Sequence, residues 1–299
     1  MNYKSEYIEK FYDKYLLQLR DRLISSQKLF FNEKREILSK DLVKEFKTVL
    51  SKAVELQKCN KKGKIMYIVL SILRSGVYTQ SCLCRIDVYD ERFYADDKEC
   101  YIEVDFPWIR SDLSELEKNI ISEMKNSSIK LPDYMIEKIV LNEVLNFSNI
   151  LYYLLRYSIE EFEKLEELQG LSKYDCLDIH IGEYYDTTKS TYIYDTRVLN
   201  SMEVRKELES KSTHNYVSIK NLDLKAGTYA NKDLCLSDFS GCDFEGSSFK
   251  NSNLAGTSWR NCNLKNVDFS GSNLSEADFR GALVENTIFN DTILNDVFW

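Results

Sequence analysis

The sequence predicts two parts of different fold class: a mainly helical α+β domain with a small antiparallel sheet in residues 1–215, and a solenoid in residues 222–299. Three observations indicate this division. Apolar residues recur at three and four positions in the N-terminal part, which is typical of amphipathic helices. Two short stretches within residues 84–106 alternate apolar and polar side chains, as half-buried strands do. From residue 222 onward, a large apolar residue recurs at every fifth position.

Residues 1 to about 75 predict helices, and helix resumes after Pro107. Ser114 and Glu117 have the spacing of a capping box. Pro132 suits the first turn of a longer helix that ends at Gly170. The first segment contains two apolar stripes at helical spacing: Ile8, Phe11, Tyr15, Leu19 and Leu23, and then Leu38, Leu42, Phe46, Val49 and Ala53.

Strand-like alternation predicts a small antiparallel sheet. Ile86 and Val88 alternate with polar residues, and so do Ile102, Val104 and Phe106, which predicts an antiparallel pair of strands. Residues 175–186 and 190–195 alternate in the same way, and a short helix over residues 201–210 is expected to lead into the last segment.

Residues 222–299 form an unbroken repeat of five-residue units. The first place of each unit is mostly small, and the fifth is often Gly or Asn, which ease tight turns. The sixteen third-place residues are Leu224, Tyr229, Leu234, Phe239, Phe244, Phe249, Leu254, Trp259, Leu264, Phe269, Leu274, Phe279, Val284, Phe289, Leu294 and Trp299. A helix cannot use this spacing, because every fifth residue drifts by about 140° around its axis. A strand cannot use it either, because at an odd spacing successive large residues would point to opposite faces of the strand. The repeat therefore predicts a coil that turns every five residues.

A second period of twenty residues indicates four five-residue units per coil. Like residues recur at that distance, as in Leu234, Leu254, Leu274 and Leu294, and in Phe249, Phe269 and Phe289. Cys242 and Cys262 are also twenty residues apart, and we interpret them as small core residues.

Motifs such as SDFSGCDFEGSSFKNSNLAG (residues 237–256) and SNLSEADFRGAL (residues 272–283) are similar to the pentapeptide repeat family. The pattern of that family is A(D/N)LXX. The resemblance covers residues 222–299 and implies a right-handed quadrilateral β-helix of four coils. It implies nothing about residues 1–215.

The outward second place of the repeat changes character in the last coil. In twelve successive units this place is polar, from Asp223 to Asp278. It then becomes apolar in four successive units, which we name the apolar collar: Leu283, Ile288, Ile293 and Phe298. Exposed apolar residues beside an uncovered solenoid end predict an interface. With Trp299, the collar predicts an end-to-end homodimer with twofold symmetry. The alternative is that a helix of residues 1–215 covers this end.

Composition bounds the choice of partners. The formal net charge is −8, which disfavours direct binding to nucleic acid or to an anionic membrane. The longest apolar run, residues 65–73, is far shorter than the roughly 20 residues that span a bilayer. The charged start MNYKSEYIEK lacks a secretory signal, and the eight cysteines contain no CxxC pair, so we expect a cytoplasmic protein with free thiols.

Two groups of polar residues are candidate reactive sites. Asp178, His180 and Glu183 could form an acid–base or metal site, and Asp87, Glu103 and Asp105 could form an acidic cluster. We favour a solvated polar strand face as the interpretation of both groups. The chain lacks HExxH, GxxxxGK[ST], GxGxxG and GxSxG motifs, so no cofactor is expected.

These observations favour a non-enzymatic interaction module that binds an unidentified protein partner. Two alternatives remain. Some pentapeptide repeat proteins of the fluoroquinolone-resistance type mimic DNA and act on DNA gyrase, and residues 222–299 carry eleven acidic against six basic residues. An enzyme or effector activity could also reside in residues 1–215.

Overall fold

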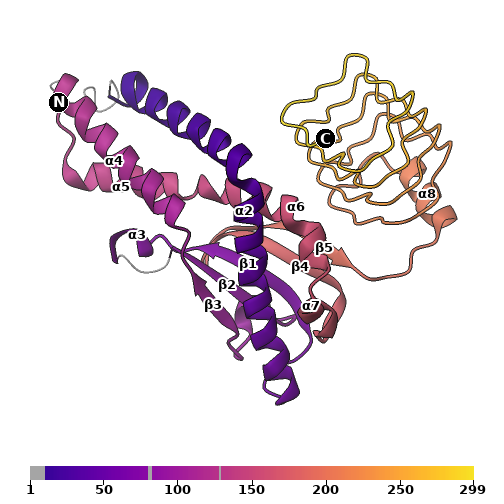
Figure 1. Ribbon diagram of the computed structural model, residues 1–299, viewed down its shortest axis with the longest axis horizontal. Helices are drawn as coiled ribbons and strands as arrows, with labels where there is room; N and C mark the ends of the chain where they lie inside the picture. Colours follow the sequence, from indigo (N-terminus) through magenta and orange to yellow (C-terminus); the bar gives the residue numbers. More distant parts are fainter. Residues whose placement is uncertain (1–10, 80–82, 128) are drawn as a thin grey trace. The chain divides into compact units, whose positions relative to one another are not determined.

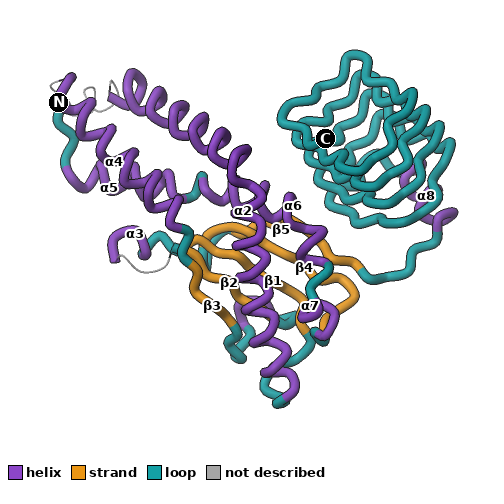
Figure 2. The backbone as a smooth tube through the Cα atoms, in the orientation of Figure 1, coloured by secondary structure: helices purple, strands orange, loops and turns teal. Residues whose placement is uncertain are grey.

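The computed structural model describes residues 11–79, 83–127 and 129–299, and the chain divides into two compact units. Unit 1 is Met1–Thr191 and contains most of the helices and the sheet; unit 2 is Tyr192–Trp299 and contains the repeat (Figure 1). The backbone tube shows that regular helices and strands are concentrated in unit 1, whereas the repeat winds as successive turns (Figure 2). No described helix combines the length and the apolar character that crossing a membrane requires.

The helices of unit 1 differ from the predicted ones mainly in where they break. The stripes at residues 8–23 and 38–53 belong, over the described residues, to one continuous helical segment. The helices of unit 1 are η1 (Tyr12–Leu16, a π-helix), α2 (Leu17–Lys58), α3 (Gly76–Thr79), η2 (Phe93–Ala95), α4 (Pro107–Ser127), α5 (Asp133–Val144), α6 (Phe147–Glu163) and α7 (Glu166–Gly170).

Two predictions about helix ends were wrong. Ser114 lies inside α4, which begins at Pro107, so Ser114 and Glu117 form no capping box. The long helix expected between Pro132 and Gly170 is three helices. It breaks between α5 and α6, and again where Leu165 adopts an extended backbone with ψ 125°. The apolar period continues through these breaks, so it could not reveal them.

The sheet has five strands in the order β3-β2-β1-β4-β5. Their bounds are β1 (Ile65–Ile72), β2 (Cys84–Tyr89), β3 (Tyr101–Val104), β4 (Lys173–Glu183) and β5 (Thr188–Asp195). The predicted antiparallel pair is confirmed as β2 and β3, with Ile86 opposite Ile102. The sheet as a whole is mixed, because β1 pairs in parallel with β4. Parallel neighbours require a crossover, and the chain between these strands supplies it through α4 to α7.

The prediction that the first 75 residues are helical was wrong for residues 65–72. They form β1, which lies between β2 and β4. Most of its side chains are buried, as expected of a central strand with neighbours on both edges. A short apolar run of this kind cannot be told from a buried helix by its period alone.

One face of the sheet is apolar and the other is polar and aromatic. Ile68, Leu70, Ile86 and Val88 alternate along β1 and β2 and are fully buried. Helix α2 contacts β2 and β3, α6 contacts β4, and the two helices pack against each other. The opposite face carries the intervening residues of each strand, which include Asp178, His180, Asp87 and Glu103. Glu183 is in register with Ile72 of the apolar face, and Asp105 follows the end of β3.

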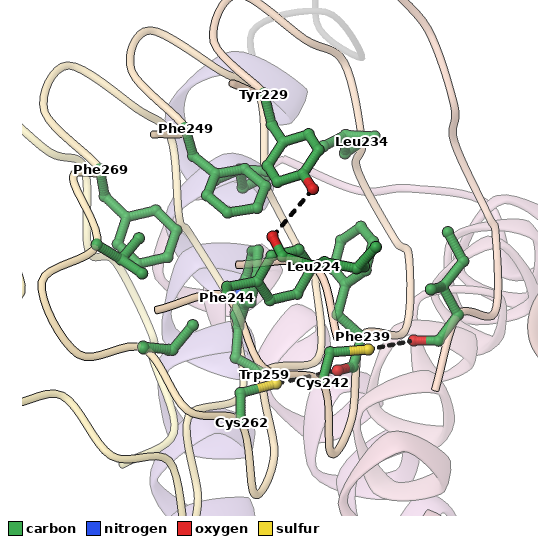
Figure 3. Packing of buried hydrophobic residues seen from close by; sticks show 14 of the residues in the cluster. Leu224, Tyr229, Leu234, Phe239, Cys242, Phe244, Phe249, Trp259, Cys262 and Phe269 are labelled. Atoms are coloured by element: carbon green, nitrogen blue, oxygen red, sulfur yellow. Dashed lines mark hydrogen bonds between the residues drawn. The ribbon is translucent and has the colours of Figure 1, made fainter. Parts of the chain in front are cut away.

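Unit 2 is a β-helix in which bridging residues are twenty apart, from Thr213 and Asp233 to Asp278 and Phe298. Every fifth-place residue from Ala226 to Asp296 has a positive φ, so the chain turns at each of them. Inside, rings stack at the same twenty-residue interval. One ladder is Tyr229, Phe249, Phe269 and Phe289, and the other is Phe239, Trp259, Phe279 and Trp299. Figure 3 shows three rings of the first ladder, Tyr229, Phe249 and Phe269, and Cys242 and Cys262 in the same core.

Helix α8 (Ser201–Ser210), found at the predicted residues, belongs to unit 2. The side chain of Asn200 caps it by accepting from the backbone N–H groups of Met202 and Glu203. Val204 and Leu208 lie one helical turn apart and pack in the same apolar cluster as the repeat.

Candidate protein-interaction surface

The coil of residues 282–299 exposes apolar side chains at places that are buried or polar in the coil before it. Leu264, Phe269 and Leu274 are fully buried, whereas their third-place successors Val284 and Leu294 are exposed. The predicted interface residues lie at this surface, with relative exposures of 55% for Leu283, 39% for Ile288, 50% for Ile293 and 62% for Trp299, and with Phe298 half-buried. The structure thus brings all five predicted residues to one coil.

Each collar residue bridges a polar residue of the preceding coil. Leu283 and Ile293 bridge Asn263 and Asn273, and Ile288 and Phe298 bridge Asp268 and Asp278. Second-place side chains point outward in the preceding coils, so their polarity is set by the surroundings of the coil and not by its core. The change from amide or carboxylate to apolar side chains therefore indicates a different environment on all four sides of this coil.

The two aromatic ladders of the core end at this surface. The Phe289 ring stacks on Phe269 at a centroid distance of 5.5 Å, and the Trp299 ring stacks on Phe279 at 5.0 Å. Phe289 and Trp299 meet edge to face at 5.9 Å. Their outer faces offer two planar apolar platforms, which are typical anchors of protein interfaces.

The backbone of this coil forms hydrogen bonds with the preceding coil. The N–H groups of Leu283 and Ile293 donate to the carbonyls of Cys262 and Ser272 at 2.9 and 3.0 Å. In the preceding coil, the N–H group of Leu264 donates onward to the carbonyl of Leu283. Among the described residues, the corresponding N–H groups of Val284 and Leu294 have no backbone acceptor. Such edge groups can pair with another chain.

The predicted group Asp178, His180 and Glu183 does not converge on a reactive site. Asp178 and His180 share a strand face, as predicted, with Nε2 3.0 Å from the Asp178 carboxylate and Nδ1 3.2 Å from the Thr188 hydroxyl. The ring packs edge to face against Tyr67, and its side chain is only 16% exposed. Glu183 pairs instead with Arg74 at 2.6 Å. Both ring nitrogens thus have neighbours within the sheet face, which suits a structural role.

The second group, Asp87, Glu103 and Asp105, is also dispersed. Asp87 is buried and accepts hydrogen bonds from Nε and Nη2 of Arg85, while Asp105 pairs with Arg110 at 3.1 Å. Burial raises the pKa of the Asp87 carboxyl, and hydrogen bonds from Arg85 partly offset this. The Arg85 guanidinium also lies 3.5 Å from the centre of the Tyr101 ring. Glu103 is exposed. No group of three or more His, Cys, Asp or Glu in the described parts of the chain could hold a metal ion.

Comparison with known proteins identifies the C-terminal part. A family model described as a pentapeptide repeat region matches residues 218–299. Residues 218–299 are a pentapeptide repeat. The resemblance predicted from the five-residue pattern is thereby confirmed, and it extends four residues further toward the N-terminus. A comparison with curated proteins gives no match.

Solved structures of pentapeptide repeat proteins are similar to parts of this chain. One from the Arabidopsis thaliana thylakoid lumen is 18% identical, with 31% of this chain and 64% of the other covered and a TM-score of 0.29. HetL from Nostoc is 20% identical, with 29% and 46% covered and a TM-score of 0.20. Rfr23 from Cyanothece is 19% identical, with 32% and 91% covered and a TM-score of 0.19. This chain thus spans less than two thirds of the first two proteins. No functional conclusion follows from likenesses at these scores.

The sequence analysis missed the residues that cover the other end of the pentapeptide repeat. Val204 and Leu208 of α8, within unit 2, join the core of the repeat there. A signal was available, because two apolar residues four apart in a short polar helix mark one buried stripe. That pattern by itself predicts a helix with one buried side but does not show what the side packs against.

Proposed function

We propose that this chain is a non-enzymatic protein-interaction module that binds a second copy of itself through residues 282–299. The observation that carries the proposal is the apolar collar. Four outward places, which are polar in every earlier coil, become apolar together, and three of the four side chains are at least 39% exposed. Contiguous exposed apolar residues of this kind are typical of interaction sites.

In finer detail, we propose that residues 222–299 form a right-handed quadrilateral β-helix of four coils. Bridges between residues twenty apart support four five-residue sides per coil. The handedness follows from the resemblance to other pentapeptide repeats.

A second copy suits this surface because the surface is self-complementary. In a twofold contact each group meets the same group of the partner, so apolar collar residues meet apolar collar residues. The rings of Phe289 and Trp299 would continue their ladders onto the partner's rings. The edge of the coil also holds both N–H donors and carbonyl acceptors, which antiparallel pairing of identical strands can satisfy.

The substitution Ile293→Asp tests the proposed dimer. Light scattering on the full chain should give twice the 35.1 kDa of one chain for the parent and a single-chain mass for the variant. A buried aspartate opposite its own copy should weaken association by at least about tenfold.

The matched control is Asn273→Asp, which places the same carboxylate on the same side, one coil earlier. It should leave the dimer intact. A parent that remains a single chain at every concentration would refute the proposal, and so would an Ile293→Asp variant that dimerises as the parent does.

The acidic side chains of the repeat lend no support to a DNA-mimicking role. Many are ion-paired within the repeat, including Asp243 with Lys225 at 3.1 Å, Asp268 with Lys250 at 2.8 Å and Glu285 with Lys265 at 2.7 Å. A mimic of DNA needs a field of unpaired negative charge. A gyrase supercoiling assay in which the added protein changes the rate would favour this alternative over ours.

A further inference from the structure

Helix α8 covers the end of the repeat opposite to the apolar collar, which we name the front end. Val204 and Leu208 are 8% and 1% exposed and pack in one cluster with Ile219, Leu224 and Tyr229. The apolar interior of the first coil is therefore closed, in contrast to the exposed interior of the coil of residues 282–299, which we name the back end.

Polar side chains of α8 also bond the backbone of the first coil. The guanidinium of Arg205 donates to the carbonyl of Lys225, and the N–H group of Thr228 donates to the Glu209 carboxylate at 3.3 Å. In the reverse direction, the Lys232 ammonium donates to the carbonyls of Glu209 and Lys211 at 2.7 and 2.6 Å. The first coil and the helix thus satisfy one another's edge groups.

These are the groups that a preceding coil would otherwise bind. One coil later, the carbonyl of Glu245, equivalent to that of Lys225, accepts from the N–H group of Ala226. The N–H group of Ser248, equivalent to that of Thr228, donates to the carbonyl of Gly227. Arg205 and Glu209 therefore replace backbone partners of Lys225 and Thr228, on sides of the repeat that no preceding five-residue unit of the described chain bridges.

The back end offers the complementary set. By the same register, its third-place N–H groups and first-place carbonyls would bind a following coil, as those of Leu264 and Cys262 do within the stack. A back end placed on a bare front end would continue the parallel ladder through groups such as the Lys225 carbonyl and the Thr228 N–H group. Such a head-to-tail contact does not close on itself, so it would build filaments.

We propose that α8 is a stop that prevents the back end of a second copy from stacking on the front end of the repeat. This inference rests on the proposed function in one respect, since it takes the back end as an associating surface. It adds that the front end is a concealed binding surface for a second copy, and that α8 limits assembly to a closed pair.

The substitution Leu208→Asp tests the stop, because it places a carboxylate against the core and should lift α8 from the front end. Sedimentation of the full chain should show a mass that rises with concentration to at least about twice that of the parent. Adding Ile293→Asp to Leu208→Asp should reverse the growth. The control Met202→Asp alters the same helix at a side chain that is 82% exposed, and should sediment as the parent does.

A second variant, Arg205→Ala with Glu209→Ala, keeps the apolar contact and frees only the edge groups, so it decides the matter if Leu208→Asp prevents folding. It should also assemble beyond the parent. The stop is refuted if folded variants, with the circular dichroism of the parent, keep the parent's mass. The proposed dimer is judged separately, from the mass of the parent alone.

Discussion

At the scale of single residues, the fifth place of each unit fixes where the coil turns. The positive φ there suits Gly and Asn, which occupy most fifth places, but Leu236 adopts it with φ 60°. A side chain with a Cβ is strained in this region unless it can bond locally, as Asn can. The fold thus imposes the backbone on a residue that does not favour it.

We therefore expect Leu236→Asn to stabilise the repeat by about 0.5–1 kcal/mol, as removal of this strain implies. Gly241→Ala, at the next fifth place, should instead destabilise the repeat. At φ 74° an added Cβ would lie 2.2 Å from the side-chain oxygen of Asn221. Thermal unfolding followed by circular dichroism checks both. A lower melting temperature for Leu236→Asn would contradict the expectation.

A buried ion pair holds two loops of unit 1 together. The Lys62 ammonium lies 2.5 Å from the Asp96 carboxylate, and both side chains are buried. Asp96 also accepts from the backbone N–H groups of Asp90 and Lys98 at 2.9 Å. Such a pair is costly to break on one side only, because the remaining charge stays buried.

Lys62→Met should accordingly destabilise unit 1 by about 3–5 kcal/mol. The double variant with Asp96→Asn should recover part of this loss, since it leaves no buried charge. Hydrogen exchange of residues 62–98 measures the local effect, with residues 222–299 as the internal control. Equal exchange in the parent and in Lys62→Met would show that the pair contributes little.

At the scale of elements, carboxylates on the sides of the repeat are tied to bases of the preceding coil. Burial alone would raise the pKa of Asp268, but hydrogen bonds from Lys250 and Ser270 hold it below the ordinary value. Burial would also raise the pKa of Asp238, but Lys220, hydrogen bonds from Ser240 and the charge of Arg260 together lower it. The pKa of Asp243 is also lowered, because hydrogen bonds from the backbone N–H group of Glu245 and from the Lys225 ammonium oppose the effect of burial.

The direction of these shifts predicts an acid-sensitive repeat. Carboxyls whose pKa is lower in the folded state stabilise it above the unfolded pKa of about 3.9, and the stabilisation is lost as the pH falls through the lower folded values. The melting temperature of the repeat should thus fall below about pH 4. Asp268→Asn should flatten this dependence, and an unchanged pH profile in that variant would count against the ion pairs as its source.

At the scale of the whole molecule, each unit has an apolar core of its own, but the two units differ in how the surfaces of that core are covered. The sheet of unit 1 has helices over one face and aromatic side chains on the other. The repeat of unit 2 is closed at its front end by α8 and exposes apolar side chains at its back end. In the parent, association between copies is therefore expected at the back end alone, which the Ile293→Asp experiment tests, whereas Leu208→Asp tests the closure of the front end.

The sequence by itself determined the features that depend on local period. Third-place residues had to be buried and fifth-place residues had to turn, because only a coil reconciles a period of five with one apolar interior. Strands β2 to β5 were also predicted from local alternation, and α8 was predicted at its observed residues. The collar was visible because it breaks the polar pattern at Leu283, Ile288, Ile293 and Phe298.

Only the tertiary structure decided which distant segments meet. No local pattern could show that residues 65–72 form a central strand, because the burial of β1 depends on β4, about a hundred residues later. Likewise, the spacing of Asp178 and His180 could not tell a catalytic pair from one held between Tyr67 and Thr188. The closure of the front end by Val204 and Leu208 is a long-range contact of the same kind. The local period of the sequence determines which face of a helix or strand a residue lies on. Packing between elements determines which other residues it contacts.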